Sequence, residues 1–197
     1  MHQYQTDDNV KNNFLIVAVL LAVLLAYLFY LATQYFQVQI PWWIESPSIL
    51  GFFGLIYWMY DKYLWKTKFV QNIEWLKTPD ISGNWKAEIR TSHDGFGEVV
   101  SGRVVIRQTA FKISIALETN TSTSNSILAA LLRSEKISEF ELIYNYINYP
   151  KADSLETMSI HLGTTRIAIS DDQKIMDGEY YTGRDRGNFG RIIFSRL

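Results

Sequence analysis

The chain opens with two long apolar stretches separated by a short loop. Residues 14–33 read FLIVAVLLAVLLAYLFYLAT and contain no charged side chain. A helix of this length covers roughly 30 Å, which is the thickness of the hydrocarbon core of a bilayer. The second apolar run covers residues 44–60, and its only charged residue is Glu45. The pattern predicts a hairpin of two transmembrane helices, and a pair of buried core helices in a soluble protein is the alternative.

The pattern changes after Pro79. From Ile81 onwards apolar and polar residues alternate, and turn residues interrupt the alternation at short intervals, which is typical of β-strands. Eight or nine such segments follow one another, with no helix between them long enough for a parallel crossover. We therefore expect an antiparallel sheet.

The number of predicted strands favours a closed sheet, because closure removes the exposed edges of a wide one. We expect an eight-stranded antiparallel up-and-down, lipocalin-like β-barrel, with an interior wide enough for one small ligand. A β-sandwich is the alternative. The predicted fold class is thus a membrane-anchored all-β protein, with two N-terminal transmembrane helices followed by the barrel.

Lysine and arginine positions predict the orientation of the hairpin. The loop between the apolar runs contains neither residue, whereas Lys62, Lys66, Lys68 and Lys77 follow the second run. Because positive charge is retained on the cytoplasmic side, both termini and the barrel are expected there. The expected segments are a cytoplasmic leader (1–13), a transmembrane helix (14–33), an outer loop (34–43), a second transmembrane helix (44–65), a juxtamembrane connector (66–79) and a cytoplasmic ligand-binding barrel (80–197).

Small residues recur along the first apolar run. Ala18, Ala22 and Ala26 are spaced four residues apart and share one helix face. Small side chains let helix backbones approach closely inside a membrane. The face therefore predicts helix packing between copies of the chain. The alternatives are packing against the chain's own second helix, or no role, since alanine is common in such helices.

Composition narrows the classes of function. The chain has no cysteine, and its three histidines lack the spacing of metal ligands. We find no phosphate-binding loop and no nucleophile motif, so neither an enzyme nor a cofactor is expected. Residues 78–197 contain 14 Lys and Arg against 15 Asp and Glu, a balance that does not favour binding to long nucleic acid.

The sequence GEYYTGR near the C-terminus is the most informative stretch for ligand binding. Alternation places Tyr180, Thr182 and Arg184 on one face of a strand. If that face points inward, a buried Arg184 needs an anionic partner, and a ligand phosphate supplies one with bidentate geometry. The alternative is a structural ion pair between Arg184 and Asp185 or Glu179.

Other polar and aromatic residues complete the candidate site. Tyr144, Tyr146 and Tyr180 are candidates for stacking on nucleobases. Gln108 and Asn145 are candidates for hydrogen bonds to base edges. The alternative is that the tyrosines are ordinary core residues.

The order of several short motifs carries a family resemblance. After the two apolar runs come Ser82-Gly83-Asn84-Trp85, a Ser/Thr run, LIYNY at 142–146, His161-Leu-Gly163, and GEYYTGR at 178–184. In this order the chain resembles the two-transmembrane β-barrel effectors of CBASS, the bacterial anti-phage systems built on cyclic oligonucleotides. The family is that of CD-NTase-associated protein 15.

The resemblance implies a receptor that is not an enzyme. A partner CD-NTase would make a cyclic dinucleotide, the barrel would bind it, and the protein would self-associate and disrupt the bacterial inner membrane, killing the infected cell. The outer loop would then be periplasmic. The resemblance also favours Tyr180, Thr182 and Arg184 as ligand contacts. A membrane-tethered lipocalin-like carrier of an apolar ligand and a structural membrane adaptor are the alternatives.

Overall fold

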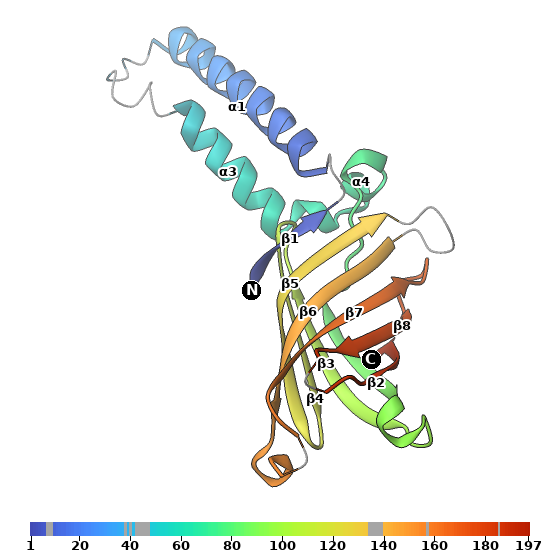
Figure 1. Ribbon diagram of the computed structural model, residues 1–197. Coiled ribbons are helices and arrows are strands. Elements are labelled where there is room, and N and C mark those ends of the chain that lie inside the picture. The colour runs from blue at the N-terminus through green and yellow to red at the C-terminus, as the bar shows by residue number, and fades with distance from the viewer. Residues whose placement is uncertain are drawn as a thin grey trace. The chain divides into compact units, whose positions relative to one another are not determined.

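A computed structural model describes residues 1–6, 10–37, 39, 41, 48–133, 140–156, 158–184 and 186–197. The chain divides into two compact units (Figure 1). One unit is Asp8–Thr78, and the other combines Met1–Asp7 with Pro79–Leu197. The expected boundary between the outer loop and the second span, at residues 43 and 44, lies outside the described residues.

The first unit is helical. Helix α1 runs from Val10 to Tyr35 and α3 from Ser48 to Lys62. Within the described residues, α1 is the one helix that is long and apolar enough to cross a membrane. Of the two predicted spans, only the first is matched by a described helix with the length and apolar character that a span requires. The described part of α3 has 15 residues and covers roughly 22 Å, which is shorter than a hydrocarbon core.

Helices α1 and α3 pack through aromatic and small side chains. Phe14 of α1 stacks on Tyr60 of α3, with ring centroids 3.8 Å apart. On the same face of α1, Ala18 and Ala22 are fully buried, and Ala26 is partly buried. The single chain thus already covers Ala18 and Ala22.

Three short elements follow α3 in the helical unit: η1 (Leu64–Lys66), α4 (Lys68–Gln71) and η2 (Glu74–Leu76). The Gln71 side chain ties them together. Its Nε2 donates to the carbonyl oxygens of Trp65 at 2.7 Å and Thr78 at 2.8 Å.

The second unit is a closed β-barrel (Figure 1). Its described strands are β1 (His2–Thr6), β2 (Gly83–Thr91), β3 (Val100–Gln108), β4 (Lys112–Thr119), β5 (Ser122–Arg133), β6 (Phe140–Pro150), β7 (His161–Ile169), β8 (Ile175–Thr182) and β9 (Phe189–Arg196). Short turns η3 (Ser92–Asp94) and η4 (Ala152–Ser154) lie between strands. Strands β2 to β9 pair in chain order, β9 closes on β2, and β1 lies between β4 and β5.

The structure corrects the predicted strand number from eight to nine. The additional strand comes from residues that the sequence analysis assigned to the leader. His2–Thr6 is short and polar, and its partners lie more than 100 positions away in the sequence. Alternation over five residues does not distinguish such a strand from an extended leader. The closure of the sheet excludes the β-sandwich.

One end of the barrel is filled with side chains. Trp85 is fully buried, and its indole Nε1 donates to the carbonyl oxygen of Ile81 at 3.0 Å. Leu142, Met176 and Phe194 are also fully buried in this core. The inward positions of β2 and β6 follow the predicted alternation, which explains why the strands could be recognised from the sequence.

Candidate functional site: a cavity inside the barrel

The other end of the barrel is hollow. It encloses a cavity of about 320 Å³, within the range of small-molecule sites. The strand register locates the cavity relative to the filled core. Trp85, near the start of β2, belongs to the core and pairs with Arg196. Thr91, at the other end of β2, pairs with Gly190 and lines the cavity. Aliphatic side chains of Ile89, Ile115, Leu117 and Ile192 form part of its wall.

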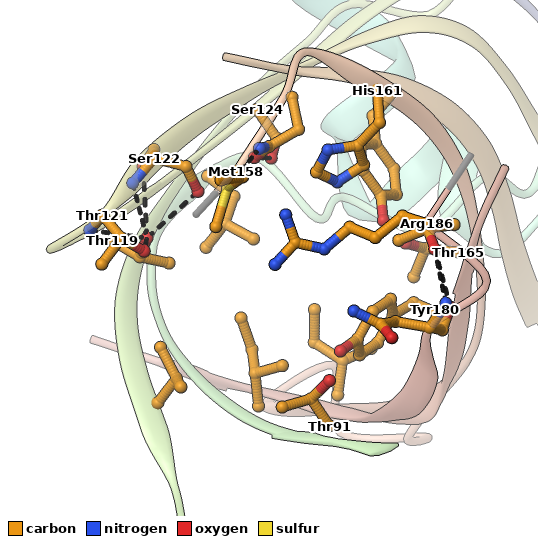
Figure 2. Close-up of a pocket in the computed structure, with 18 of the residues that line it drawn as sticks. Thr91, Thr119, Thr121, Ser122, Ser124, Met158, His161, Thr165, Tyr180 and Arg186 are labelled. Carbon is orange, nitrogen blue, oxygen red and sulfur yellow. Dashed lines mark hydrogen bonds between the residues drawn. The ribbon is translucent and has the colours of Figure 1, made fainter. Parts of the chain in front are cut away.

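Hydroxyl groups from β4 and β5 line one side of the cavity (Figure 2). Thr119 Oγ1 accepts the backbone N–H of Ser122 at 3.1 Å. Ser124 Oγ donates to Asn148 Oδ1 at 2.8 Å, and Asn148 Nδ2 lies 3.2 Å from Met158 Sδ. These contacts fix small polar side chains in the wall and leave the space in front of them open.

His161 lines the cavity from the start of β7 and is buried. Its Nδ1 lies 2.9 Å from the carbonyl oxygen of Ser159, so Nδ1 carries the hydrogen. Within the described part of the chain, no residue hydrogen-bonds its Nε2. His161 therefore presents a hydrogen-bond acceptor when it is neutral.

Three tyrosines form the aromatic part of the wall. The rings of Tyr144 and Tyr146 lie 6.2 Å apart at 52°, and Tyr180 faces the same cavity. Burial raises the pKa of Tyr144 to about 12 and also raises the pKa of Tyr146 and Tyr180. All three phenols are thus neutral at physiological pH and keep a hydrogen to donate.

Two glycines make room for two of these rings. Gly163 lies opposite Tyr146 across the β6–β7 pair, and a Cβ there would come within 2.3 Å of the Tyr146 ring. Gly190 lies opposite Tyr180, where a Cβ would come within 2.7 Å of the ring. Tyr146 and Tyr180 therefore each pair with a glycine on the neighbouring strand, and the absence of a side chain on that glycine leaves the space that the tyrosine ring occupies.

Arg186 supplies a positive charge to the cavity. Figure 2 shows its side chain reaching into the space between the walls. It comes from the turn after β8, where Thr182 Oγ1 accepts the Asn188 N–H at 2.8 Å and Gly187 has a φ of 61°. Of the described residues, none forms an ion pair with its guanidinium, and none of those that line the cavity is Asp or Glu. A half-buried arginine in such surroundings favours an anionic ligand.

The structure places four of the predicted site residues in the cavity wall: Tyr144, Tyr146, Tyr180 and Thr182. It places Arg184 outside. Strand β8 ends at Thr182, so the alternation on which the inward orientation of Arg184 depended stops before that residue. Arg184 is exposed, and its suggested partner Asp185 lies outside the described residues.

Gln108 and Asn145 also lie outside the cavity. Gln108 is buried at the filled end, where its Oε1 accepts the Ile81 N–H at 2.9 Å and its Nε2 donates to the Pro79 carbonyl oxygen at 3.1 Å. Asn145 points to the exposed outer face, because it alternates with the buried Tyr144 and Tyr146.

The sequence analysis missed Arg186, His161 and the hydroxyl wall as site residues. A signal existed for the wall, because the Ser/Thr run includes Ser122 and Ser124 at inward alternating positions. Arg186 has no comparable signal, since it lies in a turn. Among the described residues there is also no group of three or more acidic, histidine or cysteine side chains that could hold a metal ion.

Comparison with known proteins identifies the family. The sequence model described as Cap15, cyclic dinucleotide receptor domain, matches residues 76–196. The chain belongs to this family. The match covers the barrel strands β2 to β9 and confirms the resemblance found in the sequence. The family description names a receptor, which agrees with a cavity that can take an anionic ligand.

Three relatives carry the name CD-NTase-associated protein 15. The protein from Yersinia aleksiciae is 31% identical over 146 residues, covering 74% of this chain and 67% of the relative. The protein from Staphylococcus schleiferi is 32% identical over 126 residues, covering 64% and 65%. The protein from Escherichia albertii is 26% identical over 147 residues, covering 74% and 72%.

Proposed function

We propose that the chain is a CBASS effector whose barrel binds a cyclic dinucleotide in the cavity, with Arg186 as the main phosphate contact. The single observation that supports this most strongly is the position of the Arg186 guanidinium inside a cavity whose described lining has no acidic residue. A cyclic dinucleotide carries two phosphate charges and two flat bases. Arginine binds phosphate with two parallel hydrogen bonds, and tyrosine faces stack on bases.

The remaining cavity residues fit the same ligand. Tyr144, Tyr146 and Tyr180 are neutral donors with aromatic faces. His161, Thr182 and the hydroxyl wall add short polar contacts. Such groups, placed on rigid strands and a braced turn, select a ligand by geometry as well as by charge.

The helical unit supports a membrane anchor. We propose that α1 and a second span over residues 44–65 insert in the bacterial inner membrane, with a periplasmic loop at 34–43. The lysine-rich flank after α3 favours cytoplasmic termini and a cytoplasmic barrel. Within this hairpin, Ala18, Ala22 and Ala26 serve helix packing.

A CD-NTase would supply the ligand during phage infection. Ligand binding then drives assembly of several copies and disruption of the membrane, which kills the infected cell. A ligand shifts such an equilibrium only if it binds the assembled form more tightly than the free form. The proposal therefore requires that occupancy of the cavity change the barrel.

The test compares two neighbouring arginines in the full chain, purified in detergent. Isothermal titration with symmetric cyclic dinucleotides of adenine, guanine, cytosine and uracil first finds one that binds the wild type. Arg186→Ala should weaken its binding about 10- to 100-fold, the usual effect of losing a hydrogen bond to a charged group. Arg184→Ala removes the same charge two residues away and should leave affinity unchanged.

Two results would count against this proposal, the first against Arg186 as the phosphate contact and the second against the receptor function. Wild-type affinity in Arg186→Ala, with loss of binding in Arg184→Ala, would return the phosphate contact to the residue first suggested by the sequence. Absence of binding to all four nucleotides, with lipid recovered from the purified protein by mass spectrometry, would favour a carrier of an apolar ligand. Ligand-dependent leakage of dye from vesicles that contain the protein tests the membrane step.

A further inference from the structure

Strand β1 occupies a seam in the barrel wall. Strands β4 and β5 pair directly from Ala116 and Asn125 to Glu118 and Thr123. Beyond this point β1 lies between them. We define the β4–β5 seam as Lys112–Ile113 together with Ala129–Leu131, the residues with which β1 pairs.

Strand β1 has few contacts compared with the other strands. It is five residues long, with two paired positions on β4 and three on β5. Tyr4 is its buried side chain. The Tyr4 hydroxyl donates to the carbonyl oxygen of Ala110 at 2.9 Å and accepts from Gln108 Nε2 at 3.3 Å. Short elements with few buried contacts open locally at lower free energy than the core of a domain.

The point where β4 and β5 separate adjoins the cavity. Ser126 Oγ lies 2.8 Å from His2 Nε2 and accepts the backbone N–H of Ile115 at 2.9 Å. Ile115 also lines the cavity, as does Ser124, two residues before Ser126 on the same strand. The wall that faces the ligand therefore continues directly into the seam that holds β1.

Without β1, the seam has a second way to close. The antiparallel pairing that joins Ala116 to Asn125 can extend toward Lys112 and Ala129, which gives a barrel of eight strands in unbroken chain order. Docking of β1 and extension of the β4–β5 pairing use the same backbone groups, so the two arrangements exclude each other. The barrel with fewer strands is also narrower.

We propose that β1 is a detachable ninth strand and that occupancy of the cavity favours its release. This inference rests on the proposed function. A ligand that contacts Thr119 on β4 and Ser124 on β5 holds these strands together beside their direct pairing, which favours extension of that pairing into the seam. Because three residues separate β1 from α1 in the sequence, release of β1 frees the N-terminal end of a membrane helix from the barrel wall.

The experiment locks the strand with an engineered disulfide. The chain has no cysteine, so Gln3→Cys with Lys112→Cys creates a single cross-link between exposed residues that face each other across β1 and β4. Lys86→Cys with Arg103→Cys is the matched control, since it joins two exposed opposite residues of β2 and β3. Each full-length protein is titrated in detergent with the cyclic dinucleotide that binds the wild type, before and after reduction.

The oxidised β1–β4 cross-link should bind the ligand about tenfold more weakly than its reduced form, by the reciprocity of coupled equilibria. The control pair should bind equally in both forms. Hydrogen exchange of the wild type without ligand gives an independent reading, in which β1 amides should exchange faster than those of β2 and β3, and faster still when ligand is added.

The outcomes separate the two proposals. Equal affinity of the oxidised and reduced β1–β4 protein would overturn the coupling while leaving the receptor function in place. Exchange of β1 as slow as that of β2 and β3 would overturn detachment whether or not a ligand binds. Absence of binding to every form, wild type included, would overturn the proposed function and the coupling together, and the exchange data would still decide whether β1 detaches.

Discussion

The two ends of the barrel are built from the same strands but differ in the size of their inward side chains. At the filled end, Trp85, Leu142 and Phe194 meet in the centre and leave no exposed surface. At the hollow end, Thr119 and Ser124 occupy equivalent inward positions on β4 and β5 and leave a cavity of about 320 Å³. One end thus provides stability, and the other leaves space for a ligand.

This difference shows how one barrel can combine rigidity with binding. Large apolar side chains at the filled end hold every strand in register, so the hollow end can contain polar groups without losing the fold. The two ends also differ in how their polar groups are paired. Gln108 pairs with backbone groups beside the core, while the Arg186 guanidinium reaches into the cavity.

The largest expected effect comes from emptying the filled end. Trp85→Ala removes the largest side chain of the core, together with its hydrogen bond to Ile81 and its contact with the Arg196 guanidinium, 5.1 Å from the ring centroid. We expect the free energy of unfolding to fall by about 3–5 kcal/mol. Urea unfolding of the full chain in detergent measures it. Tyr149→Ala, at an exposed position of β6, is the control, and an equal loss there would contradict the contrast between the two ends.

A second effect concerns Tyr144, which is fully buried at the cavity wall. Its folded pKa of about 12 lies above the value of about 10 for an unfolded chain. The neutral phenol therefore stabilises the fold fully below pH 10, and this contribution is lost as pH rises from 10 to 12. The loss amounts to about 2–3 kcal/mol. Tyr144→Phe should remove this part of the pH dependence, as measured by unfolding at several pH values, and an unchanged slope would contradict it.

The strands of the barrel could be predicted from the sequence because burial follows their alternation. Trp85 and Ala87 on β2, and Leu142, Tyr144 and Tyr146 on β6, alternate with more exposed residues along their strands and are all buried. All four tyrosine and threonine positions proposed for the site, Tyr144, Tyr146, Tyr180 and Thr182, alternate in the same way and line the cavity. The end of the alternation also explains why Arg184 does not line the cavity, because that residue lies beyond the last residue of β8.

Two features could not be predicted, for a shared physical reason. Strand β1 depends on partners that are distant in the sequence, and the orientation of Arg186 depends on a turn braced by Thr182 and Asn188. Neither is specified by the local pattern of apolar and polar residues. A strand of five mostly polar residues and an arginine in a turn both acquire their positions from the rest of the folded barrel.

The smallest expected effect on stability comes from filling the hollow end, and it separates binding from folding. Ser124→Leu removes the hydrogen bond to Asn148 but adds apolar contacts in the cavity, so the free energy of unfolding should change by no more than about 1 kcal/mol. Binding of the cyclic dinucleotide should fall at least about tenfold, because the leucine occupies ligand space.

Thr123→Leu adds the same side chain at the neighbouring position, which does not line the cavity, and should bind normally. If titration instead shows normal binding by Ser124→Leu and weak binding by Thr123→Leu, the ligand lies outside the barrel, and the hollow end is only a less densely packed part of the core.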